Sequence, residues 1–176
     1  AQGALVEGLT AADVILREDG VEQPCLVLAN ASRPRLALFV DQSLSMPPVW
    51  RDAGALDAFA EGLTAAVQAD FPGAQVRVQA NNNSRLWANL AAATHGDPTI
   101  IVYVTDGDID GQPTPADEAA ISNGPPAVIV HVTESRRADL EAIAALSGGT
   151  VAAEATSEAA ADAVAGFLRE AELPGY

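Results

Sequence analysis

Leu36-Ala-Leu-Phe-Val40 runs directly into Asp41-Gln-Ser43-Leu-Ser45-Met46, and these eleven residues are the strongest indication of the fold class. An unbroken apolar run is typical of a central parallel strand that is buried on both faces. Three oxygen-bearing side chains follow within five residues, at the carboxyl end of the predicted strand, where open α/β sheets place their ligand sites. The stretch therefore predicts a parallel sheet and one half of a metal site.

Strand and helix signals alternate along the rest of the chain. Apolar or alternating runs predict further strands at 75–80, 99–104, 127–132 and 150–153, and helix-period runs predict helices at 53–69, 86–93, 115–121, 136–146 and 157–170. Such alternation indicates βαβ crossovers. We therefore expect a three-layer α/β domain with a doubly wound, mostly parallel sheet.

Two β-rich runs near the start of the chain, 14–17 and 21–28, lie on either side of Glu18-Asp-Gly20. An Asp-Gly pair between such runs is a hairpin signal. The chain has 176 residues, 49% of them hydrophobic, which suits a single core. We expect residues 1–34 to form an N-terminal β-hairpin extension packed on one domain, 35–176.

The charge of the chain excludes several classes of function. Its net charge is −15, with 24 acidic residues against nine basic ones, and all nine are arginine. A chain without lysine has no P-loop lysine, Schiff base or lysine general base. An acidic surface disfavours nucleic acid and anionic membranes as partners. No apolar run approaches the roughly 18 residues that span a bilayer, so we expect no membrane insertion.

Cysteine and histidine are too sparse for a zinc enzyme. Cys25 is the single cysteine, which excludes an internal disulfide and a Cys-rich zinc site. The two histidines lie far apart in sequence, and we expect His95 at a helix end and His131 in the core. We expect no histidine and no second carboxylate beside the strand-end motif.

Two motifs resemble a known family. Asp41-x-Ser43-x-Ser45-Met46 after one apolar strand, with Val104-Thr-Asp106-Gly107 after a later one, resembles the metal-ion-dependent adhesion site (MIDAS) of the von Willebrand factor A (vWA) domain. Residues 140–151 look like that family's last helix and strand, and residues 8–23 resemble a leader that precedes the domain in some bacterial envelope or secreted proteins. The resemblance implies a Rossmann-like vWA fold in one domain of a larger protein. It also implies a secreted or cell-envelope location, with a cytoplasmic one as the alternative.

The resemblance further implies a set of metal ligands. Ser43 and Ser45 would coordinate a cation through their hydroxyls, while Asp41 and Asp106 would act directly or through water. Such hard oxygen ligands suit Mg²⁺, Mn²⁺ or Ca²⁺. The cation would complete its coordination with an Asp or Glu carboxylate of a partner protein, so the implied activity is adhesion rather than catalysis.

The sequence departs from the family pattern in two places. The family takes a threonine from a loop between the two aspartates, but residues 81–98 hold only a short loop and one helix, so an edge hairpin strand and a helix are missing. By position Ser84 replaces the threonine, with Asn83 as second choice. Leu44 stands where a glycine is common.

Alternative interpretations stay open at each point. Ser43 and Ser45 are also typical of a helix cap or turn, Ser84 of an N-cap, and Asp106 of a turn. The domain would then be a metal-independent interaction scaffold that lost the site. A Mg²⁺-dependent phosphoryl-transfer enzyme of the haloacid dehalogenase or response-regulator type is least favoured, because Ser43 stands where a second carboxylate is expected and the chain has no lysine.

Overall fold

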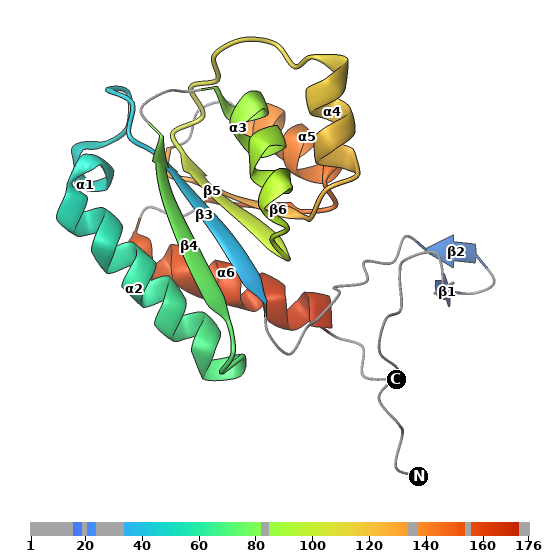
Figure 1. The fold of residues 1–176 in the computed structure, drawn as a ribbon, viewed down its shortest axis with the longest axis horizontal. Coiled ribbons are helices and arrows are strands. Elements are labelled where there is room, and N and C mark those ends of the chain that lie inside the picture. The colour runs from blue at the N-terminus through green and yellow to red at the C-terminus, as the bar shows by residue number, and fades with distance from the viewer. Residues whose placement is uncertain are drawn as a thin grey trace.

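A computed structural model describes residues 16–18, 21–23, 34–81, 85–133, 137–153 and 156–172. Five strands form one parallel sheet in the order β4-β3-β5-β6-β7, with helices between them along the chain (Figure 1). This confirms the predicted α/β class and the doubly wound sheet. The strands are β3 (Arg35–Asp41), β4 (Gln75–Asn81), β5 (Ile100–Thr105), β6 (Ala127–His131) and β7 (Thr150–Ala153). The helices are α1 (Pro48–Arg51), α2 (Ala53–Asp70), α3 (Leu86–Ala93), α4 (Pro115–Ser122), α5 (Arg137–Leu146) and α6 (Ser157–Glu172).

The predicted hairpin is present as a separate two-stranded sheet. Strand β1 (Leu16–Glu18) pairs antiparallel with β2 (Val21–Gln23), and Glu18 lies opposite Val21. This register is the one expected when two residues connect the strands. Asp19-Gly20, the ends of the predicted runs and Cys25 lie outside the described residues, and the packing of this hairpin on the domain stays a prediction.

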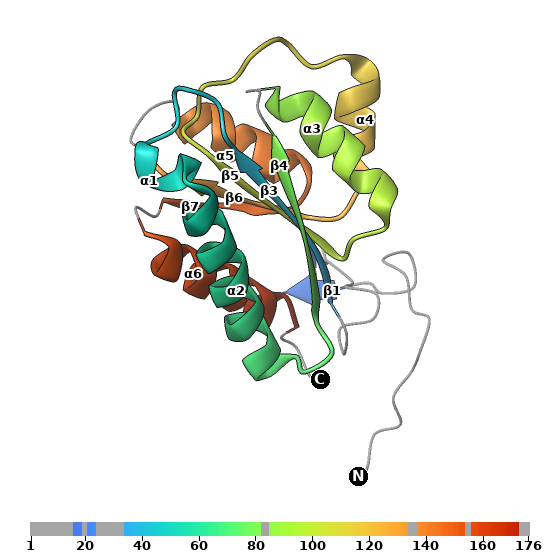
Figure 2. The same ribbon diagram turned by 60° about the vertical axis from the view of Figure 1, so that its left-hand side comes forward.

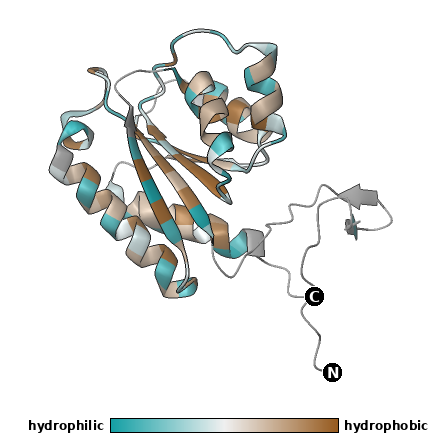
Figure 3. Cartoon of the chain, in the orientation of Figure 1, coloured by the Kyte–Doolittle hydropathy of each residue, from teal (hydrophilic) through white to brown (hydrophobic). Residues whose placement is uncertain are grey.

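Helices cover both faces of the sheet and form two cores. Side chains alternate along each strand, so Leu38 and Val102 enter one core while Phe39 and Tyr103 enter the other. Helices α1, α2 and α6 pack on the first face, and α3, α4 and α5 pack on the second (Figures 1 and 2). The interior strands carry the strongest hydrophobic colouring in the domain (Figure 3). Strands β5 and β6 are buried along their whole length, as the apolar runs predict.

The strand order creates a switch point between β3 and β5. From β3 the chain crosses through α2 to β4 on one side, and from β4 it crosses back through α3 to β5 on the other. The loops that follow β3 and β5 therefore leave the sheet toward opposite faces. Open α/β sheets bind ligands in the crevice at the carboxyl ends of such strands.

The sheet is shortened at the β4 edge, as the sequence predicts. Within the described residues β4 pairs only with β3, and α3 begins five residues after β4 ends. A connection of this length has no room for the extra strand and helix. A groove of about 420 Å³ lies beside the edge, between β3, β4 and the end of α3.

The short helix α1 was not predicted from the sequence. Pro48 begins it, since proline suits the first helical position, where its missing N–H has no partner to lose. The helix buries Trp50, whose ring meets Phe59 of α2 edge-on at 5.3 Å between centroids. None of the helices in the described part of the chain combines the length and apolar character needed to cross a membrane.

Candidate metal site at the carboxyl edge of the sheet

The predicted site residues of β3 and β5 come together at the switch point. Asp41 is the last residue of β3, and Asp106 directly follows β5. The two strands are neighbours, with Val40 in register with Val104, so their ends lie at the same level of the sheet. Both carboxylates are buried, Asp41 fully and Asp106 with 5% of its surface exposed.

One carboxylate oxygen of Asp41 accepts a hydrogen bond, and the other accepts none. Its Oδ1 accepts a hydrogen bond from the Ser43 backbone N–H at 2.7 Å. Its Oδ2 is buried and has no hydrogen-bond partner within the described residues. Burial raises the pKa of Asp41, hydrogen bonds from Ser43 partly offset this effect, and the charges of Asp106 and Asp108 raise the pKa further.

The two serines face each other on the loop that follows β3. Their hydroxyl oxygens are 2.9 Å apart, and the Met46 N–H closes a turn on the Ser43 carbonyl oxygen at 3.2 Å. The alternative that they cap the next helix is wrong for α1, because Pro47 is its N-cap and no side chain bonds there. Leu44 does not need the glycine of the family pattern, since Asp97 is the sole non-glycine residue with positive φ in the described ranges.

Asp106 begins a tight turn, and its side chain bonds to the backbone two residues further on. Its Oδ1 accepts a hydrogen bond from the Asp108 N–H at 3.0 Å, and Gly107 adopts φ 84°, which favours glycine. The turn interpretation of Asp106 is therefore correct and does not compete with a ligand role, because the residue is also buried beside Asp41. Asp108 is exposed, as expected of a turn residue.

The end of β6 adds two residues that sequence reasoning missed. Thr133 Oγ1 donates a hydrogen bond to the Asp106 carbonyl oxygen at 2.6 Å, and His131 Nε2 lies 3.3 Å from the same oxygen. The expectation that no histidine lies near the site is thus wrong, although His131 is buried as predicted. Asp106, already predicted to share the site with Asp41, raises the pKa of Asp41 by its charge. A polar residue directly after an apolar strand was the available signal for Thr133.

Ser84, which is predicted to replace the threonine ligand of the family, lies outside the described residues, as does Asn83. Their neighbours on the chain are placed: Asn81 is in register with Asp41, and Arg85 is the N-cap position of α3. The connection therefore starts level with Asp41, at the carboxyl edge of the sheet. The assignment of Ser84 stays a prediction.

The donor set fits a hard cation better than a transition metal. Across the described residues, no three His, Cys, Asp or Glu side chains form a cluster that could hold a metal ion. The strand-end site offers instead two carboxylates and two hydroxyls, and one buried carboxylate oxygen has no hydrogen-bond partner. Oxygen-only sets of this kind suit Mg²⁺, Mn²⁺ or Ca²⁺.

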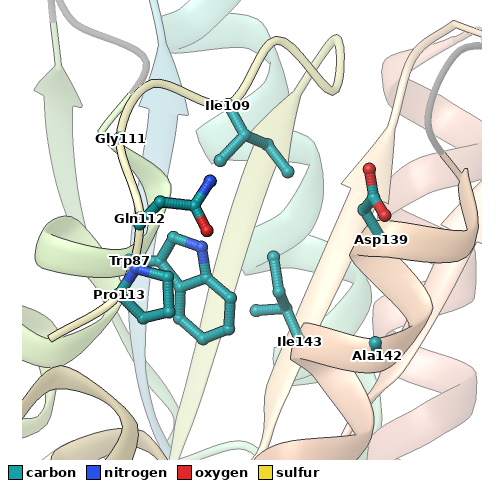
Figure 4. A pocket seen from close by; sticks show the side chains of 8 residues that line it. All are labelled: Trp87, Ile109, Gly111, Gln112, Pro113, Asp139, Ala142 and Ile143. Atoms are coloured by element: carbon teal, nitrogen blue, oxygen red, sulfur yellow. The ribbon is translucent and has the colours of Figure 1, made fainter. Parts of the chain in front are cut away.

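A small pocket lies beside the loop that carries Asp106. It holds about 280 Å³ between that loop, α3 and α5 (Figure 4). Trp87 and Gln112 lie on one side and Asp139 on the other. Trp87 is therefore a partly buried residue that lines this pocket.

Comparison with known proteins adds no family assignment: no family model matches the chain, and no curated protein matches its sequence.

Proposed function

We propose that this domain is a divalent-cation-dependent protein-binding module. Asp41, Ser43, Ser45 and Asp106 would hold the cation at the carboxyl edge of the sheet, with Ser84 as a further ligand. A partner protein would supply an Asp or Glu carboxylate to the remaining coordination position. No catalytic step is part of the proposal.

The observation that carries the proposal is the orphaned oxygen of Asp41. A buried carboxylate oxygen without a partner costs free energy, because it has lost water and gained nothing in return. Burial is the main reason that the pKa of Asp41 is raised, and the neighbouring charges of Asp106 and Asp108 raise it further. A cation at this position would satisfy the oxygen and offset the repulsion.

The resemblance to the vWA domain supports the same conclusion. Asp41, Ser43, Ser45 and Asp106 match the MIDAS pattern position by position, and the two serine hydroxyls face each other. Hydroxyls bring no charge, so a cation held by them stays attractive to an incoming carboxylate. Mg²⁺ usually keeps several waters, and one water is exchangeable for that carboxylate.

The structure adds one observation that bears on the phosphoryl-transfer alternative. The charges of Asp106 and Asp108 both raise the pKa of Asp41, and Asp108 was not among the predicted site residues. The chain still has no lysine to compensate phosphoryl oxygens, and Ser43 occupies the position next to the strand-end Asp. We therefore rank binding above catalysis.

The test is thermal unfolding and calorimetry with and without Mg²⁺ or Mn²⁺. A ligand at a hundred times its Kd stabilises a fold by about 2.7 kcal/mol, which is roughly 5 to 10 °C for a chain of this size. The stabilisation should disappear in Asp41→Ala and persist in Asp57→Ala, which removes an exposed carboxylate from α2. Absence of any binding heat in the wild type at millimolar cation would support the metal-independent scaffold instead. Hydrolysis of a generic phosphate ester that is lost in Asp41→Ala would support the enzyme.

A further inference from the structure

The connection that follows β3, together with helix α1, displays two large apolar side chains to solvent. Leu44 in the connection is 87% exposed, and Val49 in α1 is 64% exposed. The other exposed large apolar residues in the described part of the chain, Val78 and Leu146, reach only 38% each. The two most exposed apolar side chains therefore lie on the connection that carries the proposed serine ligands and on the helix that directly follows it.

These side chains are exposed although the connection itself is anchored. Met46 and Trp50 are buried in the core beneath it, with 1% and 4% of their surface exposed. The Met46 N–H bonds to the Ser43 carbonyl oxygen, and the Trp50 N–H bonds to the Pro47 carbonyl oxygen at 2.9 Å. Of the four large apolar residues in this segment, Met46 and Trp50 enter the core, and Leu44 and Val49 project outward.

The connection rises beyond the carboxyl edge of the sheet (Figures 1 and 2). Hydrophobic colouring appears at its tip as well as in the core (Figure 3). Leu44 lies between Ser43 and Ser45 in the chain, so the turn that presents the two hydroxyls also carries an exposed apolar side chain.

We propose that Leu44 and Val49 select the partner: the bound carboxylate belongs to a protein segment in which the Asp or Glu lies beside a bulky apolar side chain. This inference rests on the proposed function, because the cation is what places the carboxylate next to Leu44. The cation supplies the attraction for the acid, and the apolar pair distinguishes one acidic segment from another. Burial of one methylene is worth about a fourfold gain in affinity.

Simple carboxylates of increasing length test this inference. The intact chain is loaded with Mn²⁺, and acetate, butanoate and hexanoate are titrated while water-proton relaxation reports the displacement of metal-bound water. We expect hexanoate to bind at least tenfold more tightly than acetate, and hexanamide, which lacks the charge, to displace no water. The dependence on length should fall to threefold or less in Leu44→Ser and in the double variant with Val49→Ser.

A matched control keeps the test specific. Leu146→Ser removes an exposed leucine from α5 and should leave the whole series unchanged. Circular dichroism checks that each variant is folded, and acetate and Mn²⁺ should bind Leu44→Ser as they bind the wild type. If acetate and hexanoate bind equally, or Leu44→Ser keeps the dependence on length, the inference is wrong while the proposed function stands. If Mn²⁺ does not bind at all, the proposed function is wrong and this inference falls with it.

Discussion

Both ends of the parallel sheet contain buried polar side chains, but these differ in how completely they are hydrogen-bonded. At the amino end, the Ser147 hydroxyl accepts a hydrogen bond from the Ala127 N–H at 2.9 Å and donates one to the Ala144 carbonyl oxygen at 2.8 Å. At the carboxyl end, Asp41 is equally buried but leaves Oδ2 without a partner. Fully paired polar groups hold a fold together, whereas an unpaired buried oxygen costs stability and is expected where a ligand completes the structure.

The largest effect should come from Gly149, which lies next to β7 at the amino end. A Cβ at this position would lie 2.0 Å from the Ala127 carbonyl oxygen, and backbone cannot yield as a flexible side chain does. We expect Gly149→Ala to lower the free energy of unfolding by about 4 kcal/mol or more, measured by urea denaturation.

Gly62→Ala is the matched control for that substitution. Nothing lies within 4 Å of a Cβ at Gly62, which is exposed in the middle of α2. This variant should gain about 0.5 to 1 kcal/mol from helix propensity. Equal effects at the two glycines would contradict the tight packing inferred for the amino end.

Ser147 at the amino end and Ser43 at the carboxyl end allow the most direct comparison of the two ends. Ser147→Ala leaves a buried N–H without its acceptor, and we expect a loss of about 1 to 3 kcal/mol in urea unfolding. Ser43→Ala removes a partly exposed hydroxyl that hydrogen-bonds to Asp41, so metal-free stability should fall by no more than about 1 kcal/mol. The effect of Ser43→Ala should appear instead in cation binding. A loss at Ser43 as large as that at Ser147 would end the distinction between the two ends.

Asp41→Asn should stabilise the metal-free protein, by about 1 kcal/mol at neutral pH. Because burial raises the pKa of Asp41 in the folded protein above its ordinary value of 3.8, the folded wild type binds this proton more tightly than the unfolded chain does. Wild-type stability from this group is therefore highest at low pH and falls as pH rises from about 3.8 through the raised pKa. Unfolding of both proteins across pH should show the advantage of Asp41→Asn growing over that window and then staying constant. An advantage that grows toward low pH would contradict the burial argument.

The smallest effect should come from an exposed ion pair at the amino end. Arg35 bonds to Asp97 at 2.7 Å, but the two side chains are 51% and 86% exposed. Water and salt screen such a pair, so Arg35→Gln should change the free energy of unfolding by less than about 0.5 kcal/mol. A loss above 1 kcal/mol would mean that this end depends on surface charge as well as on buried hydrogen bonds.

The fold could be predicted largely from hydrophobic periodicity. The apolar runs and helix-period runs place nearly every strand and helix to within a residue or two, because each element buries a face whose period is written in the sequence. Helix α1 was missed because Pro47-Pro48 is a turn signal as well as a helix start, and the burial of Trp50, which stabilises this turn of helix, depends on α2.

The candidate site could be predicted only for residues that directly follow a strand in a recognisable motif. Asp41, Ser43 and Ser45 are visible as a strand end followed by oxygen ligands, and Asp106 as a second strand end. His131 and Thr133 were missed because they reach Asp106 only when β6 lies beside β5. No local sequence pattern indicates the strand order β3-β5-β6.

The shortened edge also bears on how copies of the chain meet. Strand β4 has no further strand beside it in the described part of the sheet, and an open edge of seven residues invites pairing with another molecule. Arg77 is exposed near the middle of this strand, between Val76 and Val78. An antiparallel pair of β4 strands centred on Arg77 would bring two guanidinium groups face to face. The charge of Arg77 therefore disfavours this pairing of two chains at the edge where the additional strand is missing.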